Sequence, residues 1–306
     1  MKVAAIDVGT NSVKMCVGEK TAEGKIQIVG ETSVNARLGE GFDASRRLQP
    51  EAMARALAAI RSQVQTARKL GGQRLRMVGT SALRDSANRG EFVNQIYHEL
   101  GFRLEIISEY DEARLSYNGV DLDSELGGYS GRQLVVDIGG GSTEFIYGEN
   151  GKMGLAVSVK AGAVRLTEQY FKEEKQTPEE LAEAGKMVDK LFRGVTKLAR
   201  PERLVGVGGS IVNLARVCYK VTPKRTDVVH GKRLSVVEVR GMIEDLLSKS
   251  PEERKSLVGL EPERADIILA GGVILDRILG SFEMEEVVVS TKSLRHGLVY
   301  EMLSHV

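Results

Sequence analysis

The sequence predicts a mixed α/β protein made of two similar domains, and three observations lead to this class. Apolar, strand-like segments alternate along the chain with segments of helical periodicity. A length of 306 residues suits two domains at about 150 residues each. The third observation is an internal repeat: residues 7–19 read DVGTNSVKMCVGE and residues 137–149 read DIGGGSTEFIYGE, with five identical positions and an apolar run before each copy.

Each copy of the repeat has the pattern of a strand, a glycine-containing turn and a second strand, which is typical of a β-hairpin. Two such copies predict two domains of similar architecture that face each other. Residues 127–131 read GGYSG, and this glycine-rich segment is the one best suited to link the two domains.

The other elements follow in chain order. Apolar residues at helical spacing predict a helix over residues 50–70, closed by Gly71. Capping residues predict helix starts at Thr177, Ser235 and Ser250, because each is followed three positions later by a glutamate. Strand-like runs occupy residues 76–79, 104–107, 204–207 and 286–289.

Composition excludes several classes of protein. Hydrophobic residues make up 42% and charged residues 28%, so the chain is globular, and a net charge of +1 argues against coating nucleic acid through bulk charge. The two cysteines, Cys16 and Cys218, are too far apart for a disulfide framework or a zinc site. No apolar run is long enough to span a bilayer, and Asp7 interrupts the start too early for a signal peptide. We expect a cytoplasmic protein with no membrane or nucleic-acid partner.

The two hairpin turns are the first candidates for chemistry. Glycine turns let backbone N–H groups approach a phosphate closely, and neighbouring hydroxyl, amide and ammonium groups add donors. The candidate phosphate-binding residues are Gly9, Thr10, Asn11, Ser12 and Lys14 in the first copy and Gly139, Gly140, Gly141, Ser142 and Thr143 in the second. The carboxylates of Asp7, Asp137 and Glu144 can hold Mg²⁺ or another divalent cation. A single turn of this kind would be read as a simple hairpin, but two homologous turns favour phosphate binding.

A third glycine turn, Gly208-Gly209-Ser210, leads from a predicted strand into a predicted helix. Helix N-termini bind anions, although an ordinary strand-to-helix turn is the better explanation of this segment when it is taken alone. Gly271 and Gly272 fall inside a helical pattern, where glycines mark close helix packing. No Gly-Lys-Ser/Thr phosphate loop is present in the sequence, which disfavours a P-loop enzyme.

Together these motifs resemble the superfamily of sugar kinases, heat-shock-70 proteins and actin, and more narrowly the exopolyphosphatase/guanosine pentaphosphate phosphatase (Ppx/GppA) family. The resemblance continues through the whole chain, in residues 80–84 with Asn88, 107–115, 162–168, 229–231, 264–266, and Ser290 with Leu294 and Arg295. It implies two actin-like (ribonuclease H-like) α/β domains flanking a cleft. The domains would cover residues 1–126 and 127–292, with a C-terminal helix over residues 293–306 that packs back on the first.

The family resemblance also implies a reaction. It is the hydrolysis of the terminal phosphoanhydride of inorganic polyphosphate, with Glu112 as the catalytic base and Arg84 and Arg264 as further phosphate-binding residues. Alternatives are a guanosine pentaphosphate 5′-phosphohydrolase and a non-catalytic sensor of guanosine tetraphosphate, and a homodimer is an assembly that the resemblance allows. Without the family, Glu112 would be read as a helix-start acid that the helix dipole favours.

Three positions depart from the family pattern. Glu109 stands where glycine is usual, Asp111 replaces a common glutamate, and His296 stands where an acid is usual. The histidines have no metal-binding spacing, so we expect them to be structural or surface groups.

Overall fold

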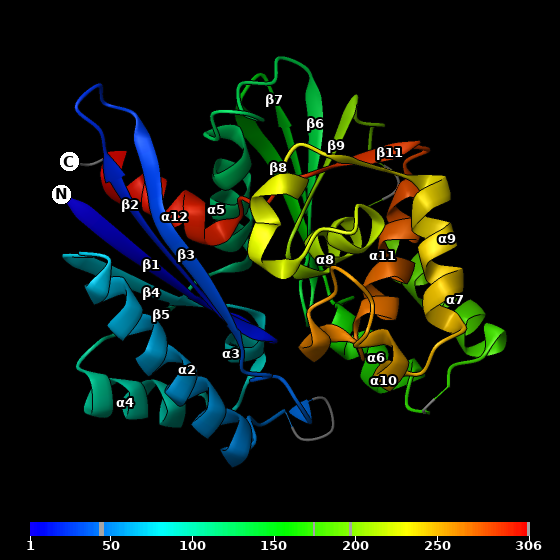
Figure 1. Ribbon diagram of the computed structural model, residues 1–306, viewed down its shortest axis with the longest axis horizontal. Coiled ribbons are helices and arrows are strands. Elements are labelled where there is room, and N and C mark those ends of the chain that lie inside the picture. Colours follow the sequence, from blue (N-terminus) through cyan, green and yellow to red (C-terminus); the bar gives the residue numbers. More distant parts are fainter. Residues whose placement is uncertain (43–45, 174, 196–197, 305–306) are drawn as a thin grey trace. The chain divides into compact units, whose positions relative to one another are not determined.

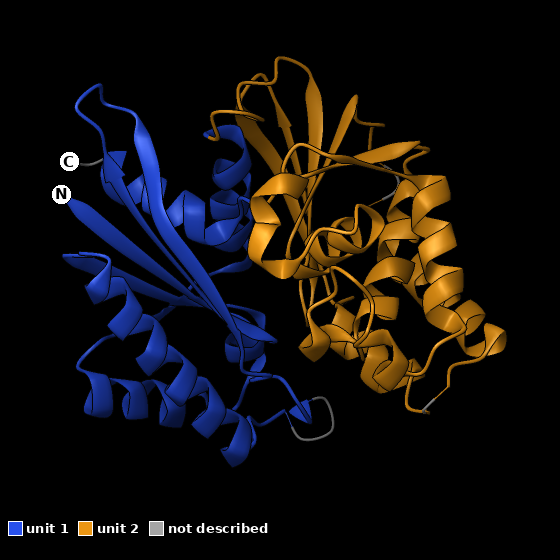
Figure 2. Ribbon diagram, in the orientation of Figure 1, with its two compact units in different colours: residues 1–122, 292–306 blue, residues 123–291 orange. Residues whose placement is uncertain are grey.

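The computed structural model describes residues 1–42, 46–173, 175–195 and 198–304, and they form two compact units (Figures 1 and 2). Unit 1 consists of residues 1–122 together with 292–306, and unit 2 consists of residues 123–291. The glycine-rich segment 127–131 therefore belongs to unit 2, where it leads into a strand. The last two residues of the helix expected over 293–306 lie outside the described part of the chain.

Unit 1 is a five-stranded sheet covered by helices on both faces. The strand order is β3-β2-β1-β4-β5, in which β1, β2 and β3 are antiparallel neighbours and β1, β4 and β5 are parallel. The strands are β1 (Lys2–Val8), β2 (Ser12–Lys20), β3 (Ile26–Asn35), β4 (Arg74–Gly79) and β5 (Leu104–Ile106). The helices are α2 (Pro50–Lys69), α3 (Ser81–Asp85), α4 (Arg89–Leu100), α5 (Glu109–Asp121) and α12 (Leu294–Ser304).

Alternation of side chains along β1 supplies two separate cores to unit 1. Ala4, Ile6 and Val8 face one apolar cluster with α2 and α4, whereas Val3 and Ala5 face a second cluster with α5 and α12. Figure 1 shows α2 and α4 lying together on one face of this sheet, and α12 packs against α5, β1 and β2 on the other.

Unit 2 repeats this architecture. Its strand order is β8-β7-β6-β9-β11-β10. From β8 to β11 this sheet has the same arrangement as the sheet of unit 1, with two antiparallel pairs followed by two parallel pairs. Strand β10 is an additional edge strand. The strands are β6 (Arg132–Ile138), β7 (Thr143–Glu149), β8 (Lys152–Val159), β9 (Arg203–Val207), β10 (Arg233–Ser235) and β11 (Glu286–Val289). The duplication predicted from the two hairpin sequences is confirmed.

The helices of unit 2 gather around α11, which contacts α6, α7, α8 and α9. They are α6 (Ala163–Tyr170), α7 (Pro178–Phe192), α8 (Gly209–Cys218), α9 (Val236–Leu247), α10 (Pro251–Arg254) and α11 (Ile268–Ser281), with 3₁₀ turns η1 (Pro223–Val229) and η2 (Pro262–Arg264). The predicted capping boxes at Thr177, Ser235 and Ser250 are confirmed at the starts of α7, α9 and α10.

Two further sequence expectations can be compared with the structure. The glycines of α11 mark close helix packing, as expected, because a Cβ at Gly271 would lie 2.7 Å from the Cβ of Ser210. Cys16 and Cys218 are both free thiols. In the described part of the chain, no helix is both long enough and apolar enough to cross a membrane.

Candidate active site

The predicted functional residues of unit 1 follow three neighbouring parallel strands. The turn of residues 9–12 follows β1, Arg84 lies on α3 after β4, and Glu112 lies on α5 after β5. Parallel neighbours end at the same edge of a sheet, and such an edge is where open α/β sheets bind ligands. Backbone hydrogen bonds from Thr80 N to Val8 O (3.3 Å) and from Ile107 N to Gly79 O (3.1 Å) join these loops to one another.

Glu112 forms an ion pair with Arg84 at this edge. Arg84 Nη1 lies 2.5 Å from Glu112 Oε2 and also donates to the carbonyl oxygen of Ile107 at 3.3 Å. Both side chains are largely buried, with exposed fractions of 11% for Glu112 and 14% for Arg84. Ser108 caps the first turn of α5 by accepting from Asp111 N, so the helix start that carries Glu112 is itself fixed. The arginine thus holds one carboxylate oxygen of Glu112 in place.

The glycine turn of unit 1 is closed by a hydrogen bond from Gly9 N to Ser12 O (3.0 Å). The segment that follows β3 binds the carbonyl groups of this turn. Ala36 N donates to the carbonyl oxygen of Asn11 and Gly39 N donates to that of Thr10, both at 2.9 Å. The carbonyls of this turn are therefore bound within unit 1.

The turn of unit 2 has the same closure, from Gly139 N to Ser142 O at 2.9 Å. The N-terminus of α6 binds its carbonyls, since Ala163 N donates to Gly139 O and Val164 N donates to Gly140 O, both at 2.9 Å. No backbone carbonyl of the described chain accepts from Gly140 N or Gly141 N in a turn or loop. The arrangement directs turn carbonyls toward α6 and leaves amide groups as the donors that the turn can offer to an anion.

This contact requires a glycine at position 162. A Cβ there would lie 2.2 Å from the carbonyl oxygen of Gly140, closer than any real contact. Arg165, one turn into α6, adds a hydrogen bond from its Nε to Gly141 O at 3.1 Å. The family resemblance included residues 162–168, but the sequence suggested only that Arg165 could line a channel for a polyanion. It did not show that this segment holds a turn more than twenty residues away.

The acids of the two hairpins have different partners across the strand pairs. In unit 1 the register partner of Asp7 is Lys14, whereas in unit 2 the partner of Asp137 is Glu144. Two carboxylates directly opposite each other on antiparallel strands repel unless a cation is shared or one is otherwise compensated. Ser158 Oγ donates to one oxygen of Glu144 at 2.9 Å.

The oxygen donors at Asp137 and Glu144 fit Mg²⁺, which prefers carboxylates and usually completes its shell with water and substrate phosphate oxygens. Among the residues that the structure describes, no three His, Cys, Asp or Glu side chains form a ready metal-binding cluster. Of the three predicted cation ligands, unit 2 therefore contains two, Asp137 and Glu144. The third, Asp7, belongs to unit 1.

The turn of residues 208–210 follows β9, directly beside β6. Gly208 has φ +92°, and a Cβ there would lie 2.6 Å from Asp137 Oδ1, so only glycine fits this position. A Cβ at Gly209 would lie 2.2 Å from Arg264 Nη2. The structure thus brings the predicted turn, Asp137 and Arg264 together within unit 2, with Ser210 buried at the start of α8.

Arg264 is buried beside a second arginine. Glu261 bridges them, with Oε2 3.1 Å from Arg264 Nε and Oε1 2.9 Å from Arg216 Nη2. Sequence reasoning missed Arg216 and Glu261, because their pairing joins residues 45 positions apart in the chain. Thr143, predicted as a phosphate ligand, is fully buried, and its hydroxyl donates to the carbonyl of Ala161.

The unusual His296 is completely buried in unit 1. Its Nδ1 accepts from Ser293 N at 3.1 Å, and its Nε2 lies 3.0 Å from Glu31 Oε2, which also pairs with Arg295 Nη2 at 2.5 Å. Burial, together with the charge of Arg295, lowers the pKa of His296 to about 4. Burial alone would raise the pKa of Glu31, but hydrogen bonds from His296 and Arg295 and the charge of Arg295 hold it well below its usual range. His296 is therefore a neutral structural group, as expected for the histidines.

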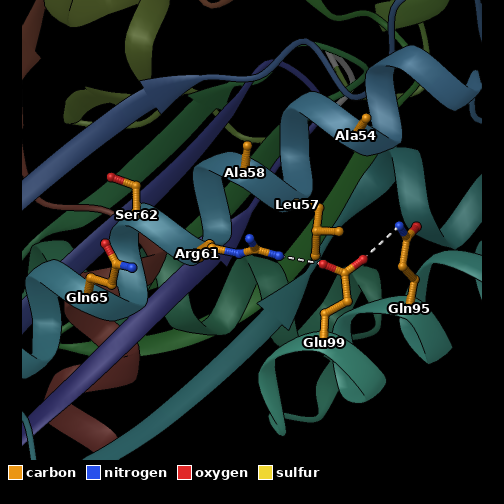
Figure 3. A pocket seen from close by; sticks show the side chains of 8 residues that line it. All are labelled: Ala54, Leu57, Ala58, Arg61, Ser62, Gln65, Gln95 and Glu99. Atoms are coloured by element: carbon orange, nitrogen blue, oxygen red, sulfur yellow. Dashed lines mark hydrogen bonds and ion pairs between the residues drawn. The ribbon is translucent and has the colours of Figure 1, made fainter.

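A surface hollow of about 470 Å³ lies elsewhere in unit 1, between the outer faces of α2 and α4 (Figure 3). Arg61 pairs with Glu99 at 2.5 Å across it, and Gln95 donates to the same carboxylate at 3.1 Å. Its remaining lining residues are Ala54, Leu57, Ala58, Ser62 and Gln65. None of the residues predicted for phosphate chemistry lines this hollow.

The fold and these turns define a class of protein: two actin-like α/β units, each with a glycine turn after its first strand, and a largely buried glutamate–arginine pair in the first. The chain belongs to the Ppx/GppA phosphatase family, whose sequence profile matches residues 17–306. It is accordingly a hydrolase of phosphoanhydride bonds, and the resemblance and fold class found from sequence are confirmed.

The similar proteins include an exopolyphosphatase and a guanosine-5′-triphosphate,3′-diphosphate pyrophosphatase, the two enzymes after which the family is named. Exopolyphosphatase 2 of Mycobacterium tuberculosis is 30% identical over 316 residues, which cover 98% of each chain. A guanosine-5′-triphosphate,3′-diphosphate pyrophosphatase of Vibrio cholerae is 32% identical over 304 residues, which cover 98% of this chain and 59% of that protein. The crystal structure of the Aquifex aeolicus Ppx/GppA family member matches with a TM-score of 0.82 and 32% identity over 100% of this chain and 98% of that one.

Proposed function

We propose that this chain is an exopolyphosphatase that hydrolyses the terminal phosphoanhydride of inorganic polyphosphate and releases orthophosphate in the cytoplasm. The observation that carries the proposal is the Glu112–Arg84 pair, held at the edge of unit 1 where the phosphate-binding turn of residues 9–12 also lies. The similarity to the M. tuberculosis exopolyphosphatase, which extends over 98% of both chains, supports polyphosphate as the substrate.

In the proposed mechanism, Glu112 accepts a proton from a water molecule as the water oxygen attacks the terminal phosphorus. The bond from that phosphorus to the bridging oxygen breaks, its electron pair stays on the shortened polyphosphate, and orthophosphate leaves. Arg84 orients the Glu112 carboxylate before the attack. Such a positioned base contributes about 10²–10⁴ to the rate.

The turns of both units bind phosphate oxygens through their amides, helped by Thr10, Ser12, Lys14 and Ser142, and in unit 2 by Arg264 with the start of α8. Within unit 2, Asp137 and Glu144 would hold a divalent cation. When bound, the cation neutralises charge on the phosphate oxygens and polarises them. Positioning and charge neutralisation make up most of the catalysis of phosphoryl transfer.

Guanosine pentaphosphate is the second candidate substrate, because the V. cholerae relative named for this nucleotide is 32% identical. Orthophosphate release should therefore be measured side by side from long polyphosphate, short polyphosphate and guanosine pentaphosphate. A higher kcat/KM for polyphosphate supports the proposal, and a higher value for the nucleotide replaces it with the second candidate. No turnover of any of the three, together with tight binding of guanosine tetraphosphate, would identify the chain as a sensor.

A further inference from the structure

His230 contacts both of the connections that join the two units. The chain leaves unit 1 between residues 122 and 123 and returns to it between residues 291 and 292. Asp123 and Thr291 are therefore the residues of unit 2 at the two crossings. His230 Nε2 lies 3.1 Å from Asp123 Oδ2, and His230 Nδ1 lies 3.1 Å from Thr291 N and 3.2 Å from Thr291 Oγ1.

The hydrogen-bond geometry fixes the tautomer of this imidazole. A backbone N–H can only donate, so Nδ1 of His230 accepts from Thr291 and carries no proton. The proton of the neutral ring is then on Nε2 and is donated to Asp123. Each ring nitrogen therefore binds one connection, and the side chains of His230 and Asp123 are only 8% and 6% exposed.

The backbone around His230 is held firmly. His230 follows Val229, whose side chain is fully buried. The next residue, Gly231, donates from its N–H to Val289 O at 2.9 Å. Val289 N in turn donates to Lys232 O at 2.7 Å, so this segment is tied to the end of β11. Gly231 has φ +72°, a left-handed backbone conformation that favours glycine at this position.

Asp123 is equally well fixed on its side. Its Oδ2 also accepts from Glu125 N at 3.0 Å and from Leu126 N at 2.9 Å. Burial opposes ionisation here, but the hydrogen bonds from His230 and from these two N–H groups outweigh it and lower the pKa of Asp123 to about 2. The first connection thus begins at an ionised carboxylate whose Oδ2 has three hydrogen-bond partners.

We propose that His230 is a positioning residue that clamps the two connections to each other through Asp123 and Thr291. With the clamp closed, bending between the units is confined to residues outside it, at 121–122 and at 292. The effect on catalysis rests on the proposed function, which assigns the base to unit 1 and the cation-binding pair Asp137 and Glu144 to unit 2. A looser clamp lets the two connections adopt more conformations, which lowers the fraction of molecules that are competent to bind substrate.

Two substitutions separate the two halves of the clamp. His230→Asn places an amide oxygen near the position of Nδ1, where it accepts from Thr291 N, but it does not reach Asp123. His230→Gln places an amide nitrogen near the position of Nε2, where it donates to Asp123, but it offers Thr291 no acceptor. His230→Ala removes both bonds, and His98→Ala, at an exposed histidine of α4, is the control.

Backbone hydrogen exchange of the full chain is the direct test. We expect exchange around residues 290–293 to rise about 5- to 10-fold in His230→Gln and His230→Ala but not in His230→Asn, since one hydrogen bond accounts for a factor of this size. Exchange around residues 123–126 should rise in His230→Asn and His230→Ala but not in His230→Gln. Unchanged exchange at both connections in His230→Ala would overturn the proposal, and so would a uniform rise across unit 2.

Kinetics supply the second readout. In His230→Ala we expect KM for polyphosphate to rise about 3- to 10-fold while kcat at saturation changes less than about 2-fold, with the Asn and Gln variants in between. If kcat of His230→Ala instead falls in proportion to the fraction of folded protein, His230 has only a structural role. That result overturns its proposed positioning role. If the parent turns over neither polyphosphate nor guanosine pentaphosphate, the proposed function fails, whereas the exchange data still decide whether the clamp exists.

Discussion

Glu112→Gln is the sharpest test of the proposed mechanism, because it removes a basic carboxylate and keeps nearly the same shape. The neutral amide of this variant would be unable to accept a proton from water, so kcat should fall by about 10²–10⁴. Binding of substrate should change little, since the turns of residues 9–12 and 139–142 hold the phosphates in the proposal. A variant with a kcat within about tenfold of the parent would remove Glu112 from the mechanism.

The structure changes the expected effect of this substitution on stability. Sequence alone suggests a helix-start acid worth at most about 1 kcal/mol at an exposed site. Glu112 is instead largely buried against Arg84 at 2.5 Å. A glutamine oxygen still accepts from the guanidinium, so the loss is the difference between a charged and a neutral hydrogen bond, about 1–1.5 kcal/mol, plus about 0.5 kcal/mol from the helix dipole.

Phosphate release at saturating polyphosphate, substrate binding and thermal unfolding should therefore be measured together. We expect a free energy of unfolding lower by about 2 kcal/mol, with the kcat deficit present well below the unfolding temperature. Glu109→Gln is the matched control, because Glu109 is an exposed acid in the same first turn of α5. It alters the same helix dipole but leaves the ion pair intact, so its kcat should match that of the parent.

Four more outcomes are expected. Hydrolysis should require a divalent cation and stop in excess chelator, and Asp137→Asn should reduce both the rate and the affinity for the cation. Polyphosphate binding should weaken as salt rises, because bound counterions are released from the polyanion; affinity independent of salt would contradict this. Gly162→Ala should cost about 1–3 kcal/mol of stability and lower kcat, because the new methyl displaces the carbonyl of Gly140. Between about pH 6.5 and pH 4 the unfolded chain binds a proton at His296 that the folded chain refuses, so stability should fall as pH drops, by about 2–3 kcal/mol, and His296→Gln should reduce this slope.

Much of the fold is readable from sequence because its signals are local. The two hairpins, the capping boxes and the position of Glu112 at a helix start all follow from residues within a few positions of one another. The repeated hairpin also predicts the repeated strand order, since a duplicated start is followed by a duplicated topology.

The contacts that shape the site could not be predicted, because they join residues far apart in the chain. Arg84 meets Glu112 only because β4 and β5 are neighbours in the sheet. Glu31 and His296 are separated by 265 positions and meet only after α12 packs on unit 1. The hydroxyl of Thr143 illustrates a different limit: its residue type suits phosphate binding, but its partner, the carbonyl of Ala161, lies on the chain after β8.

The discontinuity of unit 1 sets an order for folding during synthesis. Residues 1–122 are made before unit 2, but the helix that covers one face of their sheet, α12, is made after it. Until then Val3, Ala5, Cys16 and Val78 have no α12 side chains to cover them, whereas unit 2 is one continuous stretch that can complete its own core. In a nascent chain that has not yet reached residue 292, this apolar sheet face is therefore covered by α5 but not by α12.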